Sequence, residues 1–237
     1  MIMIHMVHLR NDLRQIIRDP IMLILMVVPL LIIGIFKMLL IFAPPFLLTR
    51  YGIDVSPYYI YIIVFTLLMM PGMLGIVTGF MMLDDKDGNI AELMSVTPLG
   101  RSGYLINRLS LSAFLSIGYS LMAYCVLDVI RVPFFSLLLL TFLLAMYSAI
   151  IGLLLFGGAD DKVKGLTFAK ALNILALFAF TDLLSLRWLT VVSWFFPSYW
   201  VTAIIKNPDS LPSLFAAIFC FTFWLGALVI RYWRKGI

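Results

Sequence analysis

Long apolar segments separated by short polar ones extend along the whole chain. Six of them approach or exceed the roughly 20 apolar residues that an α-helix needs to cross a bilayer. They cover residues 21–43, 58–83, 104–130, 133–156, 166–186 and 213–230. The pattern therefore predicts an all-α integral membrane protein, in which residues 1–237 form a single transmembrane domain of six transmembrane helices.

The composition also favours a lipid environment. Apolar residues make up 63% of the chain and charged residues 12%, against about half and about a quarter in soluble domains. No residue spacing matches a metal site, a catalytic motif or a phosphate-binding loop. We therefore expect no enzyme activity, no metal and no cofactor on this chain. The net charge of +5 is expected to serve a membrane surface rather than a nucleic acid.

Residues 1–19 have the period of an amphipathic helix. Met6, Leu9, Leu13, Ile16 and Ile17 recur on one face, and His8, Asn11, Asp12, Arg14, Gln15 and Arg18 occupy the other. This arrangement is typical of a helix that lies flat in the membrane interface, with its basic side chains toward the lipid phosphates. A plain basic anchor beside the membrane is the alternative.

The longest polar interruption of the apolar pattern lies at residues 84–103. Its acidic residues are Asp84, Asp85, Asp87 and Glu92. Three apolar residues follow helical spacing, namely Ile90, Leu93 and Met94. Asn89 is placed to cap such a helix and Pro98 to end it. We expect a short amphipathic helix, which either docks on a partner or only seals the membrane surface.

The remaining connections carry further expectations. Pro44 and Pro45 are expected to end the first span, before a polar loop at residues 49–57. Residues 157–170 are interpreted as a solvated turn. Gly72, Gly75 and Gly79 recur at helical spacing, which favours close helix packing inside the molecule.

Residues 187–212 are expected to form an extracellular interfacial segment. This aromatic-rich segment is too short in apolar stretches to cross a bilayer, and we expect two short interfacial helices broken at Pro197. Asp182 is the one acid near the interior of a span, and we expect it to pair with Arg187 or with water.

Basic residues predict which side of the membrane each connection occupies. Six spans place both termini on one side, and the segments there contain Arg10, Arg14, Arg18, Lys86, Arg101, Arg108, Lys162, Lys164, Lys170, Arg231, Arg234 and Lys235. The opposite side has Lys37, Arg50, Arg131, Arg187 and Lys206. Because cytoplasmic connections are enriched in lysine and arginine, both termini and residues 84–103 are predicted to be cytoplasmic.

Three of these features together resemble the permease subunits of type-2 ABC exporters, the ABC-2 family. The amphipathic segment leads into Arg-Asp-Pro at residues 18–20. The acidic segment after the second span starts its helix near Gly88 and ends in Thr97-Pro98. A Phe-Pro motif, Phe196-Pro197, lies between the fifth and sixth spans. The family usually has glutamates and Gly-Thr-Leu where this chain has aspartates and Gly-Asn-Ile at residues 88–90.

The resemblance implies partners and contact residues. The segment after the second span would be a coupling helix that fits a separate ATPase subunit, which would bind ATP and Mg. Its contacts would be Asp87, Gly88, Asn89, Ile90, Ala91, Glu92, Leu93 and Met94, with a second contact from Arg10, Arg14 and Arg18. Phe196, Pro197, Tyr199 and Trp200 would form an extracellular gate or interface. Two permeases, identical or sister chains, would pair with two ATPases in a prokaryotic cell membrane.

The predicted function is outward transport of an amphiphilic drug, an antibiotic peptide or a lipid-like compound. Two alternatives stay open. A secondary transporter would normally place an acid or discontinuous helices at the bilayer midplane, and this chain shows no convincing example of either. A membrane anchor or sensor subunit would bind a partner without transporting anything.

Overall fold

The computed structural model describes residues 12, 14–88, 100–184 and 186–234, and helices are its regular structure throughout. Six helical segments of this described part are long and apolar enough to cross a membrane. They are α2 (Pro20–Tyr51), η1 with α3 (Ser56–Tyr58 and Tyr59–Asp87), α5 (Gly100–Leu127), α6 (Phe134–Gly158), a broken fifth span and α11 (Leu211–Arg234). The six predicted spans are confirmed.

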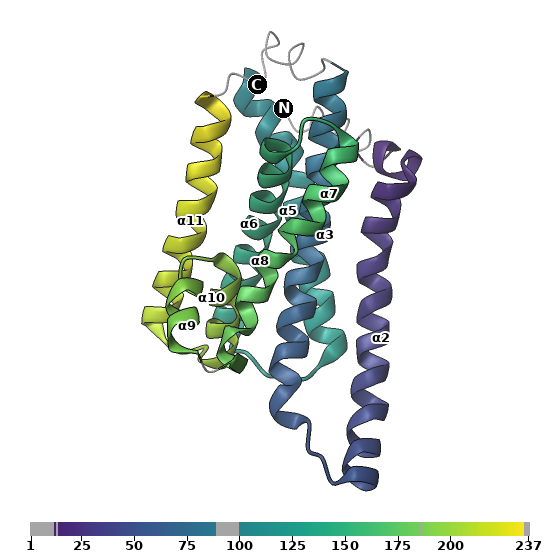
Figure 1. Ribbon diagram of the computed structural model, residues 1–237, viewed down its shortest axis with the longest axis vertical. Helices are drawn as coiled ribbons and strands as arrows, with labels where there is room; N and C mark the ends of the chain where they lie inside the picture. Colours follow the sequence, from purple (N-terminus) through teal and green to yellow (C-terminus); the bar gives the residue numbers. More distant parts are fainter. Residues whose placement is uncertain (1–11, 13, 89–99, 185, 235–237) are drawn as a thin grey trace.

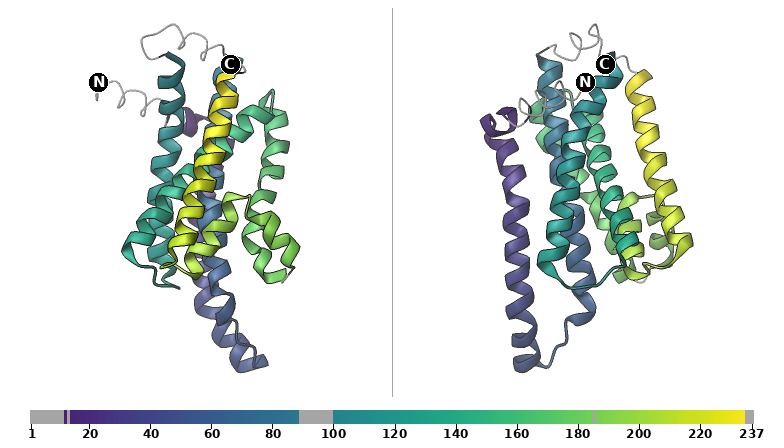
Figure 2. Two further views of the ribbon diagram at one scale, coloured as in Figure 1. Left: turned by 90° about the vertical axis from the view of Figure 1, so that its left-hand side faces the viewer. Right: turned by 180° about the vertical axis from the view of Figure 1, so that it is seen from behind.

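Helices α3 and α6 form the centre of the bundle. Most residues of both are buried, and the two helices pack along each other and against α5. A Cβ atom added at Gly75 would lie 2.4 Å from the Ser148 carbonyl oxygen, and one at Gly79 would lie 2.6 Å from the Leu155 side chain. The glycines therefore serve internal helix packing, as predicted. Figures 1 and 2 show α2 and α11 flanking this centre on opposite sides.

Helix α2 continues past the two prolines that were expected to end it. Pro44 and Pro45 lie inside the helix, which stops at Gly52 with a left-handed φ of 65°. The Gly52 N–H donates to the Leu48 carbonyl at 3.1 Å and closes the last turn. The proline prediction was wrong because the apolar residues after Pro45 keep the helical path until glycine allows the chain to reverse.

The predicted boundaries of residues 84–103 also differ from the structure. Helix α3 extends through Asp87, and α5 already begins at Gly100. Asp85 is 1% exposed, so it belongs to the interior of the bundle rather than to a solvated loop. Residues 89–99 lie outside the described part.

The fifth span is not one continuous helix. Helix α7 (Lys162–Leu172) changes at Asn173 into a single turn, α8 (Ile174–Leu177), and then into the 3-10 helix η2 (Phe178–Leu184). The carboxylate of Asp161 accepts a hydrogen bond from the Lys164 N–H at 2.8 Å and caps α7. The expected solvated turn over residues 157–170 was therefore wrong, since only residues 159–161 lie outside a helix.

Two short helices follow the broken span, as predicted. Helices α9 (Arg187–Ser193) and α10 (Pro197–Lys206) meet at an angle of 109°, and Pro197 is the first residue of α10. Hydroxyl groups of α10 donate to carbonyls of the irregular segment, Ser198 to Leu175 and Thr202 to Ala179. These hydrogen bonds satisfy backbone groups that an irregular span leaves without helical partners.

One end of the bundle collects the segments that are far apart in sequence. The start of α2, the end of α3, the start of α5, the connection from α6 to α7 and the end of α11 all lie there, at the top of Figure 1. We call this end the terminal face. The α2–α3 connection lies at the opposite end, with α9 and α10 in the half nearer to it.

Candidate functional site

A buried arginine of α5 joins the first described residues to α3. The Nε and Nη2 atoms of Arg108 each lie 2.6 Å from one carboxylate oxygen of Asp85, and Nη1 also binds Asp12. The Tyr104 hydroxyl donates to Asp85 at 2.8 Å. The three charged side chains are at most 10% exposed. One planar guanidinium thus holds two carboxylates, the geometry in which arginine binds most strongly.

A second ion pair cluster lies beside the first. The Nζ atom of Lys162, at the start of α7, donates to Asp19 and to Asp84, the latter at 3.0 Å. Asp19 also caps α2, because its carboxylate accepts hydrogen bonds from the N–H groups of Ile21 and Met22. Together, Arg108 and Lys162 connect α2, α3, α5, α7 and Asp12, which precedes α2, at the terminal face.

These contacts set the pKa of the Asp19 carboxyl group. Partial burial alone would raise its pKa. The hydrogen bonds from Lys162 and from two backbone N–H groups, with the charge of Lys162, outweigh that penalty and lower the pKa below its ordinary value. Asp19 therefore stays ionised at neutral pH.

A solvent-exposed hollow of about 570 Å³ opens next to these clusters. It is lined by Arg14, Gln15, Arg18, Asp19, Pro20 and Asp84. Arg14 and Arg18, two of the residues expected to contact a partner, are exposed. Asp12 differs from the predicted pattern, since it binds Arg108 in the interior instead of lying on the polar face.

The structure describes two of the predicted coupling residues. Asp87 ends α3 and Gly88 follows it, and both are exposed at the terminal face. Asn89, Ile90, Ala91, Glu92, Leu93 and Met94 lie outside the described residues, and so does Arg10. The helices on either side of this segment, α3 and α5, are described, and Arg108 joins them through Asp85.

A cavity of about 230 Å³ lies within the membrane-spanning part of the bundle. It is bounded by α3, α6 and the broken fifth span. Phe65 and Met69 come from α3, Tyr147 from α6, and Phe180 from η2. Asn173 reaches it from the point where α7 changes into α8. The lining is aromatic and apolar with a few polar groups, as in sites for drug-sized molecules.

An ion pair beside this cavity connects α3, η2 and α10. The Nζ atom of Lys206 in α10 lies 2.9 Å from the Asp182 carboxylate and 2.9 Å from the Tyr61 hydroxyl. Phe180 has its ring 6.1 Å from the Tyr61 ring and 6.3 Å from the Phe65 ring. The expected partners of Asp182 were Arg187 or water, and that expectation was wrong because α10 folds back and brings Lys206 to it.

Comparison with known proteins decides the family. The sequence profile described as "Fluoroquinolones export permease protein Rv2686c-like" matches residues 12–232. The chain belongs to this family of export permeases. It is 27% identical over 226 residues to the fluoroquinolones export permease proteins MT2760 and Rv2686c, from two strains of Mycobacterium tuberculosis. The match covers 94% of this chain and 83% of each relative, and no solved structure matches significantly.

This permease is therefore a multi-pass membrane transport subunit of the ABC-2 type rather than an enzyme. The residues expected at its outer gate lie together beside the broken fifth span. The Phe196 ring stacks on Phe178 of η2 at 3.8 Å, and the Trp200 indole donates to the Trp194 carbonyl at 2.9 Å. Pro197 begins α10, with Tyr199 on its first turn.

The sequence interpretation missed the ion clusters of the permease. Arg108 and Lys162 were counted only as charges that set the orientation in the membrane, and Asp12 was placed on the solvent face. One signal was available. An arginine and an acid within two neighbouring spans are costly to leave unpaired in a membrane, so Asp85 and Arg108 were candidates to find each other.

Proposed function

We propose that the permease is the membrane subunit of an ATP-driven exporter that moves fluoroquinolone-like drugs outward across a prokaryotic cell membrane. A separate ATPase subunit would bind ATP and Mg and dock on the terminal face, which would be cytoplasmic together with both termini. Membrane lipids would surround the apolar outer helix faces.

The contacts of Arg108 carry this proposal. The segment expected to touch the ATPase connects α3 to α5, and Arg108 joins these two helices at its ends through Asp85. Helix α3 also supplies Phe65 and Met69 to the membrane cavity. A force applied at the terminal face would therefore move a rigid unit that reaches the cavity, which is the rigid-body form of switching.

The size of the cavity supports a second permease subunit. Its volume of about 230 Å³ is below the roughly 300–1,000 Å³ of sites for drug-sized ligands. A second copy, or a sister chain, would complete the chamber. Helix α2 offers a free apolar surface for such packing, since only Met22, Pro29 and Ile33 are buried along its length.

Transport into inverted membrane vesicles tests the proposal. Vesicles that contain the permease and its ATPase are expected to accumulate a fluoroquinolone when ATP is supplied. Glu92→Arg or Leu93→Asp, in the proposed coupling helix, should abolish accumulation while the permease remains inserted. Lys164→Gln is the matched control on the same face, because Lys164 is exposed and contacts only neighbouring acids in its own loop.

Two results would overturn this function. Accumulation driven by a proton gradient without the ATPase would identify a secondary transporter. Binding of the ATPase with no accumulation of any fluoroquinolone would identify an anchor or sensor subunit.

A further inference from the structure

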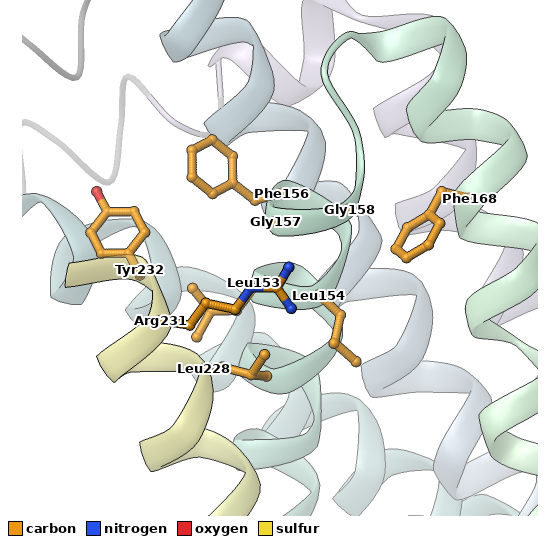
Figure 3. Close-up of a pocket in the computed structure, with 9 residues that line it drawn as sticks. All are labelled: Leu153, Leu154, Phe156, Gly157, Gly158, Phe168, Leu228, Arg231 and Tyr232. Carbon is orange, nitrogen blue, oxygen red and sulfur yellow. The ribbon is translucent and has the colours of Figure 1, made fainter. Parts of the chain in front are cut away.

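A small cavity at the terminal face is separate from the membrane cavity and shares no lining residue with the ion clusters. It has a volume of about 160 Å³ and is enclosed by the ends of α6 and α11 and by α7. Phe156, Phe168 and Tyr232 provide aromatic walls, and Leu154 and Leu228 provide part of the apolar floor. Figure 3 shows these side chains around the Gly157–Gly158 end of α6.

The volume matches one aromatic ring. An engineered protein cavity of about 150 Å³ lined by apolar side chains binds benzene. The present cavity is of that size and has ring walls that favour stacked or edge-on contact with another ring. The Phe156 and Tyr232 rings already pack on each other at 5.9 Å, so this wall is preformed.

One cation shares the cavity with these rings. The Arg231 side chain extends from α11 across the space toward Leu153 and Leu154 of α6 in Figure 3. Arg231 is exposed, and no described acidic side chain forms an ion pair with it. Arg108, Lys162 and Lys164 on this face are each bound by aspartates. A guanidinium to which no described carboxylate binds is suited to bind one from outside.

The position of Phe168 depends on a glycine. A Cβ atom added at Gly158 would lie 2.4 Å from the Phe168 ring. The ring therefore rests directly on the backbone at the end of α6. Phe168 belongs to α7, whose first residue, Lys162, is held by Asp19 and Asp84. The cavity wall is thereby anchored to the same helix that the ion cluster holds.

We propose that this cavity is a recognition site for an aromatic carboxylate on the cytoplasmic side. One ring of the ligand would occupy the space between Phe156, Phe168 and Tyr232, and its carboxylate would bind Arg231. Fluoroquinolones carry an aryl carboxylic acid, so the inference rests on the proposed function. It identifies the aryl carboxylate as the part of the substrate that the permease binds on the cytoplasmic side.

The test compares a fluoroquinolone with its methyl ester, which lacks the anion. For Arg231→Gln we expect the KM of ATP-driven transport in inverted vesicles to rise about tenfold or more for the acid, the usual effect of losing one charge-assisted hydrogen bond. The KM for the ester should not change. Arg231→Lys should fall between, because it keeps the charge and loses the two-point contact. Gly158→Ala should raise the KM for both compounds by displacing Phe168.

Lys164→Gln serves as the charge-matched control and should leave both KM values unchanged. Equilibrium dialysis of the acid with the purified permease–ATPase complex separates this inference from the proposed function, because it requires no transport. Loss of acid binding in Arg231→Gln supports the site even where transport fails. Unchanged acid binding and KM in Arg231→Gln would overturn it. So would loss of a co-purifying anionic phospholipid in Arg231→Gln while drug affinity stays the same.

Discussion

Arg108 and Asp85 form a two-point contact in which two guanidinium nitrogens each lie 2.6 Å from a different carboxylate oxygen. The pair is buried, and it stands at the two ends of the segment that connects α3 to α5. Arg108 also binds Asp12, so one guanidinium neutralises two carboxylates away from water, and removing it leaves both acids without this cation.

Arg108→Gln is therefore expected to destabilise the permease. Breaking a buried ion pair by removing one partner typically costs about 3–5 kcal/mol. The measurement is the thermal unfolding midpoint of the purified protein in detergent. Lys164→Gln, which breaks an exposed pair, should leave the midpoint nearly unchanged. Equal midpoints for Arg108→Gln and the native protein would contradict the role assigned to this contact.

Gly75→Ala should separate α3 from α6. The new methyl group would lie 2.4 Å from the Ser148 carbonyl oxygen, which belongs to the backbone and has no freedom to move aside. Overpacking of this kind costs about 1–3 kcal/mol, seen as a lower midpoint. Gly34→Ala is the matched control, because nothing lies within 4 Å of its added Cβ atom. A neutral Gly75→Ala would show that the two helices are less tightly packed.

Lys206 and Asp182 should behave as a coupled pair. Lys206→Met leaves the Asp182 carboxylate without its cation, and Asp182→Asn leaves the Lys206 ammonium without its anion. Each single change is expected to lower the midpoint, whereas the double variant should lose less than the sum of the two. The experiment is a double-mutant cycle of thermal unfolding. Strict additivity of the two changes would show that the ion pair contributes nothing.

The stability supplied by Asp19 should depend on pH. Its pKa in the folded protein lies below its unfolded value. The contribution is therefore fully present above the unfolded pKa of about 4 and is lost as the pH falls through the lower folded pKa. Asp19→Asn should be less stable than the native protein at pH 7, and the difference should shrink below about pH 4. A difference that stays constant down to pH 3 would assign the effect to something other than the carboxylate.

Hydropathy was sufficient to predict the six spans, because a bilayer imposes the length of an apolar helix whatever its neighbours are. It misplaced the ends of α2 and α3, where local composition competes with packing. Pro44 and Pro45 suggested a stop, and the acids at residues 84–87 suggested a loop. The prolines were misleading because helix-breaking residues are tolerated inside membrane helices. The acids were misleading because Asp85 has Arg108 as its partner.

The break in the fifth span had no visible sequence signal. Residues 174–184 are apolar except for Thr181 and Asp182, and they contain neither proline nor glycine. Their irregular path depends on hydroxyl groups of α10, which donate to the freed carbonyls from residues about twenty positions later. Contacts of this kind follow from tertiary packing, and the same holds for Lys206 reaching Asp182 and for Lys162 reaching Asp19.

The length of α2 has a consequence for how the molecule sits in lipid. Its 32 residues span about 48 Å at 1.5 Å per residue, against a hydrocarbon thickness of about 30 Å. Figure 1 shows the hairpin of α2 and α3 reaching beyond the other helices at that end. The mismatch is therefore confined to one edge of the bundle, where the bilayer must thicken locally or the hairpin must tilt. Reconstitution into lipids with longer acyl chains should raise the unfolding midpoint, and shorter chains should lower it.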